Sequence, residues 1–214
     1  MEQQLIIAIG REYGSGGHEI AEAMAEQFGL DFYDKNILEE IAQAQQVSSD
    51  HLKRYDEVPR FPWMSRNVRG YSNSLEENIA EMQFEFLRHK AKKGNSFVVV
   101  GRCAEEILRE YPALLSIFVI GRMEDKVKRI SEKQHVSPDN ARLIIARNDR
   151  KRKMYHNYYC QNKWGDSRGY DLSISTSTVG VERTKDLLEH YIREVMADIE
   201  QEQRSESGLD NKEE

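Results

Sequence analysis

The strongest constraint on the fold is a glycine-dense segment between the first apolar run and the first amphipathic run. Leu5–Ile9 is short, apolar and rich in β-branched residues, which predicts a buried parallel strand. Apolar residues then recur at helical spacing over His18–Phe28, and Gly29 stands where a C-cap glycine is expected. Four glycines lie in the eight residues between these two elements: Gly10, Gly14, Gly16 and Gly17. A strand, a glycine-rich loop and a helix in this order predict an α/β fold with an anion-binding turn.

Strands and helices alternate along the rest of the chain, which implies parallel pairing in a sheet covered on both faces. Further strands are expected at 31–33, 96–100, 114–120 and 170–175. Helices are expected at 35–46, 74–93, 104–110 and 124–134, from Pro138 past Arg152, and at 181–200. Residues 47–73 break this pattern and are interpreted as part of an inserted subdomain or a mobile loop.

The 214 residues predict one domain, either alone or carrying a small inserted subdomain. A net charge of −6 argues against general nucleic-acid binding. No apolar run approaches the roughly 20 residues that a membrane span needs, and the two cysteines form no disulfide framework, so a cytoplasmic protein is expected. The helix at 74–93 offers a surface for a homodimer. The polar, acidic residues 201–214 are expected to be a disordered tail.

The glycine loop is predicted to bind a phosphate-bearing ligand, most simply a nucleotide. The N-terminus of a helix exposes unpaired N–H groups, and glycine lets the backbone approach an anion closely. The alternative is a glycine-rich turn without a ligand, which the four glycines disfavour.

The loop departs from the Walker A pattern G-x-x-x-x-G-K-[ST]. One residue too many separates Gly10 from Gly16, and Gly17 stands where the lysine is expected. Arg11 is the nearest residue that could supply the missing charge. Glu19 lies near the Ser/Thr position and could help to hold Mg²⁺, although a solvated residue in the first helical turn is the favoured interpretation.

Arginines follow two of the other predicted strands, as Arg102 and Arg122. An arginine just past a strand end projects into the crevice where ligands of α/β sheets bind, and its guanidinium suits phosphate. The alternative for Arg102 is a surface pair with Glu105 or Glu106, and this residue alone does not decide between the two.

A basic cluster at 147–153 contains five cations and one carboxylate. Such a cluster is usually a solvated helix face, but in a kinase its arginines could close over a transferring phosphoryl group as a lid. The aromatic residues that follow are expected to belong to the core, with base stacking as the less favoured alternative: Tyr155, Tyr158, Tyr159 and Trp164.

Several segments together resemble the cytidylate kinase-like family. They are IIAIGREYGSGGHEIAEAMAEQFGLDFYD, VVVGRCAEEIL, RNDRKR with the following YY and KWGD, and YDLSIST. The resemblance as a whole runs from about residue 4 to 195. The resemblance implies a P-loop NTPase-type, three-layer αβα fold with a parallel sheet. It also implies a helical inserted NMP-type subdomain at about 35–93 and a lid at about 147–168, within one kinase-like domain over 1–200.

The resemblance implies roles for residues as well. The loop Gly10–His18, Ser15 included, would hold the phosphates of ATP, and Asp34 would border the monophosphate site. Arg102 would bind the acceptor nucleotide. Arg147, Arg150 and Arg152 would form the arginine-rich lid, with Mg²⁺ as the metal. The chain departs from cytidylate kinases at Gly17, which replaces the lysine, and at Cys103, which replaces an aspartate.

These observations predict a nucleoside monophosphate kinase that transfers phosphate from ATP to CMP or a similar acceptor. Arg11, Arg102 and the lid arginines would then replace the missing lysine. Two alternatives stay open. One is a nucleotide-binding sensor or regulator without activity, which Gly17 favours. The other is a kinase for a different small hydroxylated molecule, which the irregular segment 47–73 leaves room for.

Overall fold

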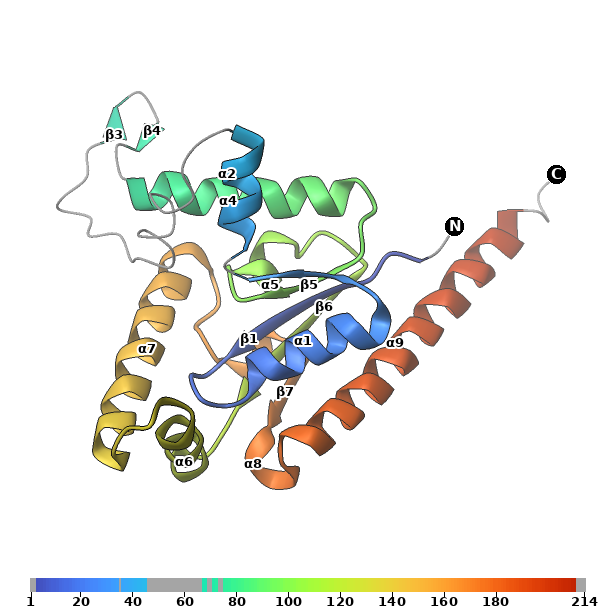
Figure 1. The fold of residues 1–214 in the computed structure, drawn as a ribbon. Helices are drawn as coiled ribbons and strands as arrows, with labels where there is room; N and C mark the ends of the chain where they lie inside the picture. The colour runs from blue at the N-terminus through green and yellow to red at the C-terminus, as the bar shows by residue number, and fades with distance from the viewer. Residues whose placement is uncertain (1–2, 35, 46–66, 69–70, 73–74, 211–214) are drawn as a thin grey trace.

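The computed structural model describes residues 3–34, 36–45, 67–68, 71–72 and 75–210. Within them, five parallel strands form the central sheet in the order β2-β5-β1-β6-β7 (Figure 1). The strands are β1 (Ile6–Arg11), β2 (Asp31–Tyr33), β5 (Phe97–Val100), β6 (Leu114–Ile120) and β7 (Leu172–Ser175). Strand β1 is central, because Ile6 lies opposite Phe97 of β5 on one side and opposite Leu114 of β6 on the other. The predicted parallel sheet is confirmed.

Helices cover both faces of this sheet, because alternate residues of a strand point to opposite sides. Ile6 and Ala8 pack with α2 (Ile37–Gln45), α4 (Leu75–Lys92) and α5 (Ala104–Ile107). Ile7 and Ile9 pack with α1 (Gly17–Phe28) and α9 (Val181–Asp210). The fold is therefore the predicted three-layer αβα arrangement, as Figure 1 shows.

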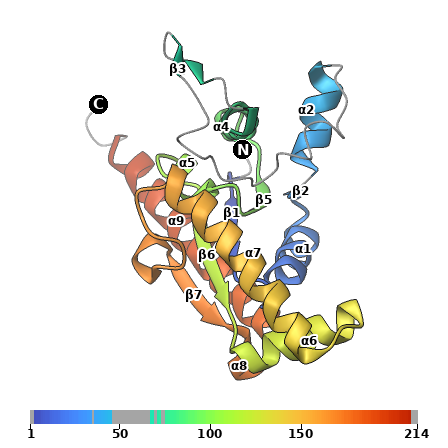
Figure 2. The ribbon, with the colours of Figure 1, turned by 90° about the vertical axis from the view of Figure 1, so that its left-hand side faces the viewer.

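A pair of helices, α6 (Met123–Gln134) and α7 (Pro138–Tyr159), extends from the end of β6 beside the glycine loop (Figure 2). Ser137 caps α7 by accepting a hydrogen bond from the Asn140 N–H, and Pro138 stands at the first helical position. The two helices bury apolar residues between them: Val127, Ile130, Ala141 and Ile145. After α7 come a 3₁₀ turn (Ser167–Gly169), β7 and the short helix α8 (Thr176–Val179).

The last helix is longer than expected. Helix α9 continues to Asp210, so residues 201–210, expected to be disordered, are helical, while 211–214 lie outside the described residues. The physical reason is that this segment is rich in Glu, Gln and Arg, which are good helix formers that extend a helix already nucleated on the sheet. Helix α5 is shorter than expected and ends at Ile107, because Pro112 and the turn into β6 follow closely.

The irregular segment at 47–73 lies mostly outside the described residues. Its described parts are β3 (Asn67–Val68) and β4 (Tyr71–Ser72), which pair in antiparallel fashion. The flanking helices α2 and α4 stand where helices were predicted. Among the described helices, none combines the length and the apolar character that a bilayer span requires.

We expect Gly29→Ala to destabilise the fold by about 1–2 kcal/mol, because alanine is strained in the left-handed conformation that the backbone adopts at this position. Gly29 ends α1 with a φ of 64°, and an added Cβ would meet no atom within 4 Å, so the effect is purely conformational. Urea unfolding measures the loss. Gly29→Asn is the matched control and should lose less, since Asn tolerates this conformation; equal stability of the Ala variant and the parent would contradict the prediction.

Candidate functional site

The glycine loop forms a tight turn between β1 and α1. Gly14 and Gly16 have φ angles of 82° and 88°, a left-handed conformation that favours glycine. The Ser15 hydroxyl donates to the carbonyl of Glu12 at 2.9 Å, and the Thr176 hydroxyl donates to the carbonyl of Ser15 at 2.7 Å. These bonds fix the loop at the N-terminus of α1, where helical N–H groups favour an anion.

A pocket of about 500 Å³ lies over this loop and is lined by residues of α1, α6 and α7. This volume lies within the range of small-molecule sites. Four basic side chains line it: Arg11, Arg129, Lys133 and Arg152. Three carboxylates line it as well: Glu12, Glu19 and Asp34. The combination of helical N–H groups and basic side chains suits a polyphosphate.

The structure gives a physical reason for the missing lysine. A Cβ added at Gly17 would lie only 2.6 Å from the Cβ of Arg11 and 3.2 Å from that of Val119. The first carbons of the Arg11 side chain, with Val119 of β6, thus occupy the space that the Cβ of a side chain at position 17 would enter. Arg11 is 7% exposed and borders the pocket, so the strand end supplies a cation that the helix start lacks.

Asp34, at the end of β2, gathers three basic side chains beneath the pocket. Its carboxylate lies 3.3 Å from His18 Nδ1, 3.5 Å from an Arg102 nitrogen and 4.0 Å from an Arg11 nitrogen. Burial favours the neutral acid, but the hydrogen bond from His18 and the charges of Arg102 and Arg11 outweigh it and lower the pKa of Asp34 to about 2. Asp34 is therefore ionised at neutral pH. The same hydrogen bond raises the pKa of His18 above its usual value, against the opposing effect of burial.

Arg102 is not a surface residue. It is 1% exposed and pairs with Asp34, which rules out the surface pair with Glu105 or Glu106 considered from the sequence. Arg102 and Cys103 are two consecutive residues with left-handed φ angles, 61° and 54°. This unusual turn directs the guanidinium back under the sheet edge toward Asp34.

A second ionic group fastens α7 to the glycine loop. Asp149 accepts a hydrogen bond from the Tyr13 N–H at 2.6 Å, and its other oxygen lies 3.2 Å from Lys126 Nζ. Lys126, 3% exposed, also bonds Glu12 at 3.0 Å, and Glu12 accepts the Gly121 N–H at 3.2 Å. Burial raises the pKa of Asp149, while the Tyr13 N–H and Lys126 act against the rise. These contacts hold α6 and α7 in a fixed position against the glycine loop.

The predicted site residues divide into two groups. The structure brings Arg11, Asp34 and Arg102 together, and it places Arg152 in the pocket wall, where it donates to the carbonyl of Arg11 at 3.3 Å. Loop residues Gly14, Gly16, Gly17 and His18 line the same pocket. Ser15 is buried beneath it.

The remaining predicted site residues lie outside the pocket, are paired with another side chain or serve packing. Arg147 and Arg150 are exposed on α7 and do not line the pocket. Glu19 pairs with Lys133 Nζ at 3.1 Å. A Cβ at Gly10 would lie 2.6 Å from Phe118, so this glycine serves packing against the neighbouring strand.

Sequence reasoning missed the basic face of α6. Lys126, Arg129 and Lys133 recur at intervals of three and four, which places them on one side of the helix. Arg129 donates to the carbonyl of Gly14, and Lys133 borders the pocket. The spacing was a usable signal for a basic face, but the contact of this face with the glycine loop depends on how α6 packs in the folded structure. The core prediction for the aromatic residues holds for Tyr155, which packs with Phe84 in a buried cluster, and in part for Tyr159 and Trp164, which are half-buried. It is wrong for Tyr158, which is 39% exposed, because this residue lies on the outer side of α7.

A parallel sheet of this order, a glycine loop at the N-terminus of the first helix and a basic helix pair over that loop define a P-loop kinase fold. The chain belongs to the cytidylate kinase-like family, whose model matches residues 6–178. Its family and fold are those of small-molecule kinases, phosphotransferases that in general use ATP and Mg²⁺.

Two solved structures illustrate these relations. An uncharacterized protein from Eubacterium ventriosum ATCC 27560 is 38% identical, with a TM-score of 0.71, over 89% of this chain and 99% of that chain. Shikimate kinase from Bacteroides thetaiotaomicron is 12% identical, with a TM-score of 0.52, over 88% of this chain and 98% of that chain, and so shares the fold. No curated protein matches this chain.

We expect Asp149→Ala to lower the free energy of unfolding by about 1–3 kcal/mol, because it removes the acceptor of the Tyr13 N–H and leaves Lys126 with one carboxylate fewer. Urea unfolding and the dissociation constant of ATP measure the effect. Asp149→Asn keeps an acceptor for Tyr13 and should lose less. Lys151→Ala, on the exposed face of the same helix, is the control for helix effects. An Ala variant that matches the parent in both measurements would show that the contact is dispensable.

Proposed function

We propose that this protein transfers the γ-phosphoryl group of ATP, with Mg²⁺, to CMP or a similar nucleoside monophosphate. The observation that carries the proposal is the exchange at the loop: Arg11 fills the space of the side chain that Gly17 lacks, within a pocket lined by three further cations. On this proposal, the positive charge that binds phosphate is retained but comes from Arg11 of β1 and not from a lysine at position 17.

The donor phosphates would bind over the glycine loop. The N–H groups at the start of α1 face this position, and Arg11, Arg129, Lys133 and Arg152 surround it. Transfer of a phosphoryl group needs little covalent help from the protein, so positioning and neutralisation of charge would supply most of the catalysis.

Asp34 and Arg102 would serve the acceptor side. The ionised Asp34 can accept a hydrogen bond from a hydroxyl group of the acceptor. Arg102 holds Asp34 in place, and its guanidinium suits an acceptor phosphate.

The residues present fit a magnesium ion that is held mainly by phosphates. All three pocket carboxylates already lie beside basic side chains: Asp34 beside Arg102, Arg11 and His18, Glu12 beside Lys126 and Glu19 beside Lys133. The protein could therefore supply few ligands, and phosphate oxygens and water would hold most of the ion. Mg²⁺ commonly binds through one carboxylate, water and phosphate oxygens. The ion would supply neutralisation of charge on the donor phosphates.

The exchange between Arg11 and Gly17 is tested by a double-mutant cycle. We expect Arg11→Gly to lower kcat/KM by about 100-fold, the scale for loss of one group that stabilises the transition state. Gly17→Lys alone should also impair ATP binding, because its Cβ overlaps Arg11. The double variant should recover part of the activity, since the lysine then enters the vacated space. Strictly additive losses would show that the two positions act independently. Thermal unfolding of each variant controls for folding.

The acceptor is identified by ADP formation from ATP and Mg²⁺ over a panel of CMP, dCMP, UMP and a hydroxylated carboxylic acid such as shikimate. We expect turnover that depends on a nucleoside monophosphate. Arg102→Ala should lower kcat/KM by about 100-fold or more, while Arg142→Ala, exposed on α7, should leave it unchanged. Circular dichroism verifies the fold of Arg102→Ala, with Arg102→Lys as a milder replacement.

Other results with this panel of acceptors would favour the two alternative functions. Turnover only with the non-nucleotide acceptor would make the protein a kinase of a different small molecule. Tight binding of ATP without turnover on any acceptor would favour a sensor or regulator and would overturn the proposal.

A further inference from the structure

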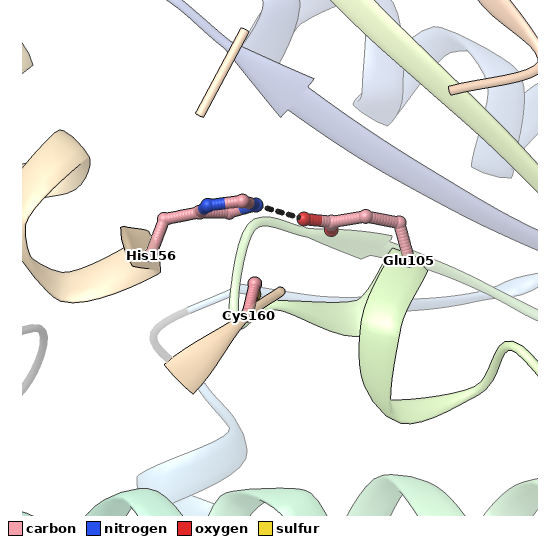
Figure 3. A group of neighbouring side chains, drawn as sticks. All are labelled: Glu105, His156 and Cys160. Atoms are coloured by element: carbon pink, nitrogen blue, oxygen red, sulfur yellow. Dashed lines mark hydrogen bonds and ion pairs between the residues drawn. The ribbon is translucent and has the colours of Figure 1, made fainter. Parts of the chain in front are cut away.

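Three side chains with metal-binding chemistry meet away from the glycine loop. They are Glu105 in α5, His156 in the last turn of α7 and Cys160, the C-cap of that helix. One carboxylate oxygen, one imidazole nitrogen and the thiol sulfur all lie within 4.8 Å of one another. Figure 3 shows Glu105 and His156 facing each other, with Cys160 pointing toward the pair.

One nitrogen of the His156 ring has a hydrogen-bond partner, and the other nitrogen has none within the described structure. Its Nε2 is hydrogen-bonded to Glu105 Oε1 at 2.5 Å, and both side chains are only 8% exposed. Its Nδ1 is buried and has no hydrogen-bond partner within the described structure. Because Nε2 is the nitrogen that faces Glu105, it is the one that could share an ion with that carboxylate, and Nδ1 lies on a different edge of the ring.

We propose that Glu105, His156 and Cys160 bind a zinc ion. Zinc accepts a thiolate, an imidazole and a carboxylate together, whereas Mg²⁺ and Ca²⁺ bind almost only oxygen. The helical spacing of four residues between His156 and Cys160 brings both to the same side of the chain. Glu105 approaches from α5, so the ligands come from two elements already packed together.

Zinc prefers four ligands, and the structure has room for the fourth. A cavity of about 20 Å³ adjoins the cluster and is lined by Glu105 and His156. This is about the space that one water molecule requires. Three protein ligands and one water would complete a tetrahedral site.

The local charges permit such a site despite nearby arginines. Arg11, Arg102 and Arg152 line the same cavity, and Asp34 lies beside both Arg11 and Arg102. The carboxylate of Glu105 and the thiolate of Cys160 carry two negative charges between them. These charges balance the two positive charges of zinc, so the bound ion adds no net charge beside the arginines.

A proton competes with the metal. Burial opposes the charged form of His156, but the neighbouring Cys160 thiol and the Glu105 carboxylate outweigh it and raise its pKa to about 10. Because metal ligands must be deprotonated, zinc has to displace this proton. The affinity is therefore measured at a pH fixed for every variant.

Cobalt(II) is the spectroscopic probe for the site. The full chain is reduced, treated with a chelator, desalted and titrated with Co²⁺, followed by Zn²⁺. We expect one Co²⁺ per chain, with a thiolate-to-cobalt charge-transfer band and the strong visible bands of tetrahedral coordination, and we expect Zn²⁺ to abolish both. Zinc should also raise the melting temperature, because it joins α5 to the end of α7.

Variants assign the ligands. His156→Ala and Cys160→Ser should each reduce the affinity at least tenfold, the scale for loss of a metal-site group, and Cys160→Ser should remove the charge-transfer band. Cys103→Ser is the matched control: Cys103 packs in the cluster beside Cys160 but is outside the three-residue ligand group. It should keep the spectrum and the affinity.

The wild-type titration decides the matter even if a variant fails to fold, as judged by circular dichroism. Absence of stoichiometric binding to the reduced wild-type chain overturns the proposal. So does binding that persists unchanged in both His156→Ala and Cys160→Ser. Because the readout is metal binding and not phosphoryl transfer, its outcome is independent of the proposed kinase activity.

Discussion

The central position of β1 determines where the chemistry can occur. Because β1 pairs in parallel with both β5 and β6, the carboxyl ends of these strands meet at one edge of the sheet. Arg11 ends β1, Arg102 follows β5, and Asp34 follows β2, which pairs with β5. Residues far apart in the chain therefore share one crevice. The glycine loop leaves the same edge and brings the N-terminus of α1 to these charges.

The buried charges at this edge depend on one another. Two guanidinium groups surround one carboxylate, with His18 as a further donor, and none of the three charged groups is well exposed. Removing one partner from a buried ionic group leaves another charge uncompensated, which is far more destabilising than the loss of a surface pair. Each of these charges therefore depends on the others for its stability in the pocket floor. Such fixed charges suit a reaction whose transition state is stabilised mainly by electrostatics.

The sequence predicted the parts of the structure that local patterns determine. The strand–glycine–helix unit, the capped start of α7 at Ser137 and the alternation of strands and helices each follow from spacing within a short window. The burial of Arg102 could not be read in this way, because its partner Asp34 is 68 positions away. The basic face of α6 was visible as a spacing, but its direction depends on tertiary packing against the loop.

The turn that carries Arg102 combines a strained backbone with a buried ion pair. Two successive L-residues, Arg102 and Cys103, hold the left-handed conformation, at roughly 1–2 kcal/mol each. Glycine at either position would relax the backbone, yet glycine at 102 would remove the cation that Asp34 needs. Glycine at 103 would remove a side chain that is 2% exposed and packs in the cluster with Phe84 and Tyr155. The left-handed turn is therefore retained because each of its two side chains makes a buried contact that a relaxed backbone would lose.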